Sequence, residues 1–347
     1  MRRQDILLGG VLLLLILIVA ACSPKEQTPA PAPASPVPTT SPTQAATPTP
    51  PVEEAPPLEV APDALENLNS YRSRVIWQNT VEGGATETIT VEQEETRDPL
   101  ARRIRITQEG GESPGALELV QIGNMAWMCS PDGGCIQSQQ SAEEAAYTFG
   151  EGVLLKPEDL LAFGEYRYVG RDTVNGVRSR HYTLNLPASA LAELARGTVT
   201  ANKADVWVAD ESGMSAYVTR FVIQWEGTGE DGKKIAGSWT YELYDVNQRF
   251  TIQPPAGAPA IPEDIPMCAG FTNQTITGNM ILLTCPDSAE AVAEFYRNEM
   301  ARLGWRAGSE SLLGNMVTQE WTKENRKASL MISPGDQGGC MVMITVE

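Results

Sequence analysis

Short segments rich in β-branched residues, each ending near Gly, Pro or Asp, follow one another through the middle of the chain. Examples are "RVIWQNTV" at 74–81, "TETITVEQEE" at 86–95 and "RRIRITQE" at 102–109. Alternating segments of this length between turn residues are typical of antiparallel strands. The pair Asn175-Gly176 is also a strong signal for a two-residue hairpin turn. The sequence therefore predicts a long antiparallel meander.

Three short helices are expected within this meander, at about 62–74, 156–163 and 189–197. Each combines a short apolar pattern with a helix start or stop signal, and the last is expected to end at Gly197. The strands and helices together predict an α+β domain over residues 58–257.

A Pro-rich linker at 254–264 leads into a second, smaller domain, 258–347. Its best-defined element is the helix in "PDSAEAVAEFYRNEMARLGW", where Asp287 and Glu290 form a capping-box pattern and Gly304 ends the helix. Strands are expected before this helix in "GNMILLTC" and after it in "NMVTQEWT", "KASLMIS" and "CMVMITV". The second domain is thus predicted to be a small β-α-β-β-β module.

The N-terminus has a basic start followed by the apolar run Ile6–Ala21. The run has 16 residues, fewer than the roughly 20 that a membrane-spanning helix needs. Val19–Cys22 resembles the lipobox of bacterial lipoproteins, in which the Cys thiol receives a diacylglycerol thioether and becomes the first residue. The resemblance implies a signal peptide at 1–21 and a mature chain carrying diacylglycerol and palmitate on Cys22. The alternative is an uncleaved signal anchor with an incidental Cys.

Residues 22–57 follow the predicted cleavage site and contain 12 of the 25 prolines, interleaved with Thr, Ala and Ser. Such a segment cannot bury a core and favours extended, polyproline-like conformers. It is expected to be a disordered stalk between the lipid and the folded domains. The predicted location is the extracytoplasmic face of the cell membrane, or the outer membrane in a cell with two membranes.

The formal net charge of the chain is −18, and no segment after the signal is basic. Nucleic acid is excluded as a partner, because phosphate binding needs clustered Lys and Arg. The predicted contact with the membrane is through the lipid on Cys22.

Five cysteines remain after Cys22, in a compartment that favours disulfides. Cys129 and Cys135 flank the turn signal Ser-Pro-Asp-Gly-Gly, so a hairpin would bring them within disulfide reach. A metal site is the weaker alternative there. The remaining cysteines are Cys268, Cys285 and Cys340, of which two can pair; the sequence does not decide which.

The sequence contains no His-Glu-x-x-His motif. His181 is the only histidine and alternates with apolar neighbours on an expected strand. The loop "GTGEDGKK" at 227–234 lacks a Ser or Thr after its Lys and lies between strands, so it is interpreted as a hairpin turn. We expect no enzyme activity, no cofactor and no metal site.

Four motifs in order resemble landmarks of the LolA/LppX-like lipoproteins of the bacterial envelope. They are "QIGNMAWMCSPDGG", "GRDTVNGVRSRHYTL", "ADVWVADESGM" and "YELYDVNQRFTIQPPAG". The resemblance covers most of 58–257 and implies an incomplete antiparallel β-barrel capped by short helices. In that group the concave face holds an acyl chain or another apolar ligand.

Large aromatic residues on the expected strands are the candidates for lining such a cavity. They are Trp77, Trp127, Trp207, Phe221, Trp225 and Trp239. The simpler interpretation of each is a packed core residue. The leading hypothesis is a membrane-anchored lipoprotein that binds or carries a lipid or acyl chain. The alternatives are a non-enzymatic envelope or sensory module that binds a protein partner, and a structural surface protein.

Overall fold

The computed structural model describes residues 56–61, 63–111, 114–140, 157, 161–162, 164–213, 215–335 and 338–347. The predicted signal peptide, the modified Cys22 and nearly all of the stalk lie outside these residues, as does most of the helix expected at 156–163. Among the described residues, no helix has the length and hydropathy needed to cross a membrane.

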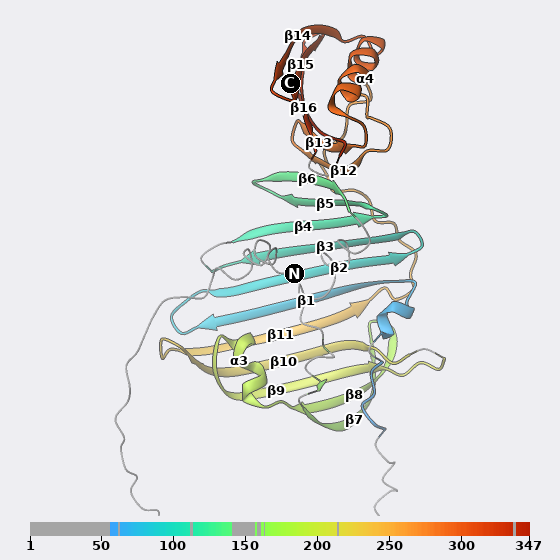
Figure 1. Cartoon of the computed structure of the whole chain (residues 1–347). Helices are drawn as coiled ribbons and strands as arrows, with labels where there is room; N and C mark the ends of the chain where they lie inside the picture. The colour runs from blue at the N-terminus through green and yellow to red at the C-terminus, as the bar shows by residue number, and fades with distance from the viewer. Residues whose placement is uncertain are drawn as a thin grey trace, which may run out of the picture. The chain divides into compact units, whose positions relative to one another are not determined.

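In the part of the chain that the structure describes, seventeen strands form one sheet, in which every neighbouring pair is antiparallel (Figure 1). The first eleven are β1 (Ser70–Val81), β2 (Thr86–Arg97), β3 (Leu100–Glu109), β4 (Gly115–Ile122), β5 (Met125–Ser130), β6 (Gly134–Gln139), β7 (Glu165–Val174), β8 (Val177–Asn185), β9 (Gly197–Ala209), β10 (Val218–Gly229) and β11 (Lys234–Tyr244). Their order across the sheet is β7-β8-β9-β10-β11-β1-β2-β3-β4-β5-β6. The large antiparallel open sheet predicted from the sequence is therefore present.

The turns of this sheet follow the local sequence signals. Asn175 and Gly176 join β7 to β8 with φ angles of 51° and 83°, as a two-residue hairpin turn requires. The Gly-rich loop at 227–234 joins β10 to β11 and is a hairpin connection.

The helices of this part are shorter than predicted. Near 62–74 only one 3₁₀ turn forms, η1 (Ala64–Asn67), because β1 begins at Ser70 and takes the remaining residues into the sheet. The helix α3 (Ala188–Ala195) is followed by Arg196 in the left-handed conformation, with φ 52°, and not by a left-handed Gly197. Glycine at position 197 is needed for space, because a Cβ there would lie 2.5 Å from the carbonyl oxygen of Thr228.

The remaining strands are β12 (Thr272–Thr277), β13 (Met280–Cys285), β14 (Arg306–Leu313), β15 (Met316–Lys323), β16 (Arg326–Pro334) and β17 (Cys340–Val346). They follow β6 in the order β12-β13-β17-β16-β15-β14. The predicted strands correspond to β13, β15, β16 and β17, while β12 and β14 were not expected. β14 is exposed along its whole length, which removes the apolar alternation that marks a half-buried strand.

The helix α4 (Ala289–Arg302) packs on this second set of strands (Figure 1). Its N-cap is Ser288, whose Oγ accepts a hydrogen bond from the amide of Ala291 at 3.3 Å, so the predicted cap at Asp287 was one residue early. Gly304, with φ 86°, ends the helix as predicted. The buried face of α4 comprises Ala289, Val292, Ala293, Tyr296 and Met300.

Two main hydrophobic clusters lie in the sheet, one built from residues 64–243 and the other from residues 265–344. Both belong to one compact unit, 54–347, which also contains two disulfides. A chain starting at residue 54 therefore carries its own cores and cross-links, and we expect it to fold independently.

Cys129 and Cys135 are bonded, and their strand positions are directly opposite each other in the β5–β6 hairpin, as the sequence predicts. Cys268 pairs with Cys285, which resolves the choice left open by the sequence. Cys340 is a buried free thiol opposite Cys285, and burial raises its pKa.

Candidate functional site

Residues alternate between two faces of the sheet formed by β1–β11. The apolar face is defined here by the side chains on the same side as Val75 and Val91, which are directly opposite each other on β1 and β2. The charged face is the other side, defined by Arg72, Arg74 and their neighbours. Strand pleating places successive side chains on opposite faces, so register alone assigns each residue to one of them.

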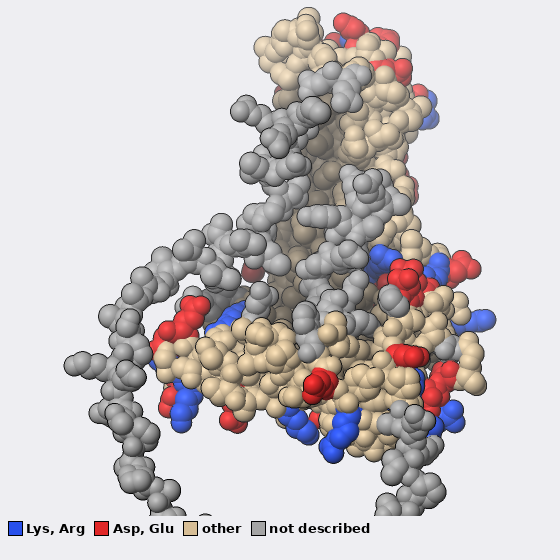
Figure 2. All heavy atoms as spheres, turned by 60° about the horizontal axis from the view of Figure 1, so that its bottom comes forward, with Lys and Arg blue, Asp and Glu red and all other residues tan. Residues whose placement is uncertain are grey.

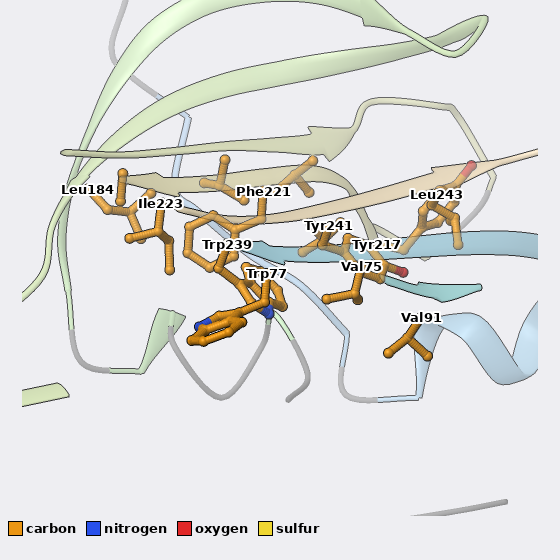
Figure 3. Close-up of a cluster of buried hydrophobic side chains, with 14 of the residues drawn as sticks. Val75, Trp77, Val91, Leu184, Tyr217, Phe221, Ile223, Trp239, Tyr241 and Leu243 are labelled. Carbon is orange, nitrogen blue, oxygen red and sulfur yellow. The ribbon is translucent and has the colours of Figure 1, made fainter. Parts of the chain in front are cut away.

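One region of the apolar face is a closed core, which we call the closed part. It contains Trp77, Phe221, Trp225 and Trp239, with exposed fractions of 8, 0, 2 and 2%. Register places these residues together, because Trp77 is opposite Trp239 and Trp239 is opposite Ile223. Figure 3 shows Trp77, Phe221 and Trp239 gathered on one side of the strands.

The helix α3 covers the closed part, lying against β9, β10 and β11 (Figure 1). Trp77 Nε1 donates a hydrogen bond to the carbonyl oxygen of Leu194 at 2.9 Å, and the guanidinium of Arg196 lies 4.7 Å from the Trp77 ring centroid. Leu191 of the helix is fully buried. These four aromatic residues are therefore core residues.

Two of the predicted cavity residues lie on the opposite face. Trp207 alternates with the buried Val206 and Val208, so it points to the charged face, where its ring stacks on His181 with centroids 4.3 Å apart. Trp127 is opposite Val120 and belongs to a separate small cluster with Ile252. The prediction that Trp127 and Trp207 line a common cavity with the other four is wrong, because alternation puts them on the other side of the sheet.

A second region of the apolar face is only partly covered, and we call it the open part. Ile89, Ile106 and Leu117 are half-buried at the edge of the main core. Met128 and Ile136 are 47% and 38% exposed and are directly opposite each other on β5 and β6. Leu119, opposite Met128, connects them to the core. The open part thus presents apolar side chains from five neighbouring strands.

Polar side chains border the open part at one end, forming a row across β1–β4. Tyr71 is opposite Glu95, Glu95 is opposite Arg102, and Arg102 is opposite Gln121. We call these four residues the polar row. Tyr71, Glu95 and Gln121 are only 5, 3 and 4% exposed. Buried polar groups on an otherwise apolar face carry a cost unless they are paired, so they mark a specific arrangement.

Glu95 is the centre of the polar row. Its Oε1 lies 2.8 Å from Nη1 of Arg97, and its Oε2 lies 3.5 Å from Nε of Arg102. The hydroxyl of Tyr71 donates a hydrogen bond to Oε2 at 2.9 Å. Burial, followed by the charge of Glu95 and this hydrogen bond, raises the pKa of Tyr71 above its ordinary range.

The charged face carries a ladder of alternating cations and carboxylates. Arg72 Nε lies 2.8 Å from Glu94, Glu94 lies 2.9 Å from Nη1 of Arg103, and Arg103 Nε lies 3.0 Å from Glu118. A pocket of about 240 Å³ occurs here, lined by Arg72, Glu92, Glu94, Arg103, Arg105 and Tyr244. Figure 2 shows acidic and basic side chains interspersed on the visible surface. Mutual pairing of this kind is typical of a solvated sheet face, and such exposed pairs stabilise little.

The single histidine is part of the same charged face. His181 Nε2 lies 2.9 Å from Oδ1 of Asp205, which also contacts Lys203. The described residues contain no group of three His, Cys, Asp or Glu side chains placed to hold a metal ion.

Comparisons with known proteins agree with the resemblance seen in the sequence. A family described as START domain-like matches residues 267–339. No curated protein matches the chain. Among solved structures, the chain is similar to the lipoprotein LppX of Mycobacterium tuberculosis, with 20% identity and a TM-score of 0.32 over 55% of this chain and 93% of LppX.

The chain is also similar to two further solved structures. A LolA superfamily protein from Nitrosomonas europaea matches with 11% identity and a TM-score of 0.21, over 56% of this chain and 96% of that protein. MucB in the MucA/MucB complex of Pseudomonas aeruginosa matches with 13% identity and a TM-score of 0.25, over 82% and 92%. The LolA/LppX-like resemblance predicted from the sequence is thus matched by the solved structures.

The open part and the polar row were missed by the sequence analysis. Ile89, Ile106 and Leu117 are ordinary strand residues, and nothing local distinguishes a half-exposed apolar position from a buried one. A usable signal was the acidic and basic pattern of β2 and β3, where Glu95 and Arg102 occupy positions on the apolar side of the alternation.

Proposed function

We propose that this chain is a lipid-anchored extracytoplasmic protein that binds an acyl chain, or a similar apolar ligand, on the open part of its apolar face. The observation that carries the proposal is the exposure of Met128 and Ile136 beside a face whose other half is closed. An apolar ligand lying there would remove these side chains from water. Burial of roughly 300 Å² of apolar surface is worth about 7 kcal/mol before the costs of association.

The mechanism is passive binding without a chemical step. The strands β2–β6 supply a preformed apolar surface on a regular sheet, so little ordering of the protein accompanies binding. LppX, to which the chain is similar, is a lipoprotein, which supports a lipid-anchored location in this proposal. The lipid on Cys22 and the stalk supply the anchor in this proposal. A protein-binding envelope module stays a prediction.

The ligand is tested by native mass spectrometry on residues 54–347 purified after exposure to lipid extracts. We expect the unsubstituted protein to carry a bound apolar molecule. The Met128→Glu variant should lose this molecule, because its carboxylate would be desolvated beneath the bound acyl chain. Met341→Glu is the matched control, since Met341 is 45% exposed on β17 in the second set of strands. Absence of any bound lipid in the unsubstituted protein, or equal loss in both variants, would contradict the proposal.

The anchor is tested separately on the full chain. We expect the wild-type protein in the membrane fraction, with acyl chains on an N-terminal Cys22. We expect the Cys22→Ala variant to lack this lipid modification. An unmodified Cys22 in a chain that keeps residues 1–21 would show the uncleaved signal anchor instead.

A further inference from the structure

We propose that the polar row, Tyr71, Glu95, Arg102 and Gln121, binds the polar end of the ligand, and that this end is an uncharged group bearing hydroxyls, as in a glyceride. The inference rests on the proposed function, because it assigns a headgroup to the ligand of the open part. It also explains why charged and amide side chains occupy an apolar face.

Successive rows across β1–β4 change from polar to apolar. The next row is mixed and contains Ser73, Gln93, Ile104 and Leu119. The third row is fully apolar and contains Val75, Val91, Ile106 and Leu117. The distance from Tyr71 to Trp77 along β1 is about 20 Å, at roughly 3.4 Å per residue. A surface with this gradient is complementary to an elongated molecule with one polar end.

The four residues of the row are neutral together, since Glu95 and Arg102 carry opposite charges, and Arg97 beside them adds one positive charge. Glu95 has two guanidinium neighbours, Arg97 and Arg102, and accepts the hydrogen bond of Tyr71. Gln93 Nε2 donates to the Tyr71 hydroxyl at 3.2 Å. A carboxylate or phosphate on the ligand would have to lie beside the Glu95 carboxylate, which disfavours an anion.

Among the described residues, three buried side-chain atoms of the row have no well-aligned hydrogen-bond partner: Glu95 Oε1, Arg102 Nε and Gln121 Oε1. Glu95 Oε1 lies 2.8 Å from Nη1 of Arg97, which leaves the other two atoms for a ligand. Gln121 Oε1 is a buried acceptor, although its Nε2 donates to the carbonyl oxygen of Gly123 at 3.1 Å. Arg102 Nε is a buried donor without a well-aligned acceptor. These residues are register partners on β3 and β4. A hydroxyl both donates and accepts, so it can pair with both atoms, whereas a carboxylate or phosphate monoanion offers mainly acceptors. A buried donor or acceptor without a partner costs free energy. A ligand hydroxyl that pairs with both atoms should therefore bind more tightly than a ligand without one.

The test compares three probes that share one chain: 1-oleoylglycerol, methyl oleate and oleate. Residues 54–347 are used, and dissociation constants are measured by displacement of a fluorescent alkyl probe. We expect 1-oleoylglycerol to bind about tenfold more tightly than methyl oleate, the value of one or two hydrogen bonds. Equal dissociation constants for 1-oleoylglycerol and methyl oleate are expected if water alone occupies the row, and this result overturns the inference. Tightest binding by oleate also overturns it. Failure of methyl oleate and 1-oleoylglycerol to bind at all overturns the proposed function instead.

Gln121→Met is the variant that isolates the row, because it keeps the side-chain length and removes the acceptor. We expect it to bind methyl oleate as the wild type does and to lose the preference for 1-oleoylglycerol. Gln78→Met is the matched control, since Gln78 lies on β1 with an exposed side chain on the charged face. Loss of preference in Gln78→Met as well would contradict the assignment. The three-probe comparison on the wild type decides the matter even if Gln121→Met does not fold.

Discussion

In both the closed and the open part of the apolar face, side chains alternate along the strands, but the two parts differ in how deeply these side chains are buried. In the closed part, Phe221 and Ile223 are fully buried, and α3 lies over the strands. In the open part, the equivalent positions on β5 and β6 are Met128 and Ile136, which remain substantially exposed. The two regions differ in that α3 covers the closed part. One half of the face is therefore a packed core, and the other half leaves apolar side chains partly exposed.

The largest difference between the two parts is expected for side-chain truncation. Phe221→Ala removes a fully buried ring from the closed part and leaves a cavity, so we expect the free energy of unfolding to fall by about 3–5 kcal/mol. Met128→Ala, in the open part, is expected to cost less than about 1 kcal/mol, because its side chain is 47% exposed. Urea denaturation of residues 54–347 measures both. Similar losses would show that the open part is a core as well.

Two glycines provide a second comparison, based on space for a methyl group. A Cβ on Gly237 in β11 would lie 2.5 Å from Cζ2 of Trp225 and 2.4 Å from the carbonyl oxygen of Gln78. We therefore expect Gly237→Ala to destabilise the protein by about 1–3 kcal/mol, as overpacking does. A Cβ on Gly115 in β4 would meet nothing within 4 Å. Gly115→Ala is expected to be neutral or to stabilise by up to about 1 kcal/mol, since it restricts the unfolded chain. Thermal denaturation of the two variants tests the pair, and equal effects would contradict it.

The sequence predicted the strands and turns well because these depend on neighbouring residues. The hairpin at Asn175-Gly176 follows from two adjacent residues that tolerate positive φ. The prediction that Trp127 and Trp207 line the same cavity as the other aromatic residues failed for a different reason. Both faces of this sheet carry aromatic residues, so alternation separates two sets of side chains without showing which set is the core. That choice depends on α3 and on the segment around Ile252, which come from distant parts of the chain.

The candidate site was less accessible to sequence reasoning than the fold. The polar row joins Tyr71, Glu95, Arg102 and Gln121 only through the register of three strand pairings. A one-residue slip in any of them would move a member to the other face. The alternation pattern indicates that Glu95 and Arg102 lie on the apolar side, but it does not determine register, so the four residues could not be joined into one row before the structure was known.

Trp77 links the closed part to its cover, and its substitution tests that link. Trp77→Phe removes the hydrogen bond to Leu194 and weakens the contact with Arg196. We expect a loss of about 1–2 kcal/mol and faster hydrogen exchange in α3. Trp127→Phe is the matched control, because its Nε1 donates to Oε1 of Gln137 at 3.0 Å on the other face. Hydrogen exchange in α3 should not change in the Trp127→Phe variant. A change would argue against the interpretation that α3 covers only the closed part.

Tyr71 and Tyr217 supply the smallest and most specific comparison, between a paired and an unpaired buried hydroxyl. The Tyr71 hydroxyl donates to Glu95, whereas the hydroxyl of the fully buried Tyr217 has no hydrogen-bond partner among the described residues. We expect Tyr71→Phe to lower stability at pH 7 by about 1 kcal/mol, because Glu95 loses a donor. Tyr217→Phe should leave stability unchanged or raise it by up to about 1 kcal/mol, since an unpaired polar group is removed.

The two variants should nevertheless respond alike to alkali. Burial raises the pKa of Tyr71, with the charge of Glu95 and the hydrogen bond to it as further causes, and burial raises the pKa of Tyr217 to about 12. Each folded phenol therefore holds its proton more tightly than the unfolded chain does. The stability contribution is complete below the unfolded pKa of about 10 and is lost as pH rises above it, by up to about 1.4 kcal/mol per pH unit for each group. Denaturation measured from pH 9 to 11 should show a shallower decline in both variants than in the wild type. A shallower decline in Tyr217→Phe alone would mean that Tyr71 is not held in a buried polar row.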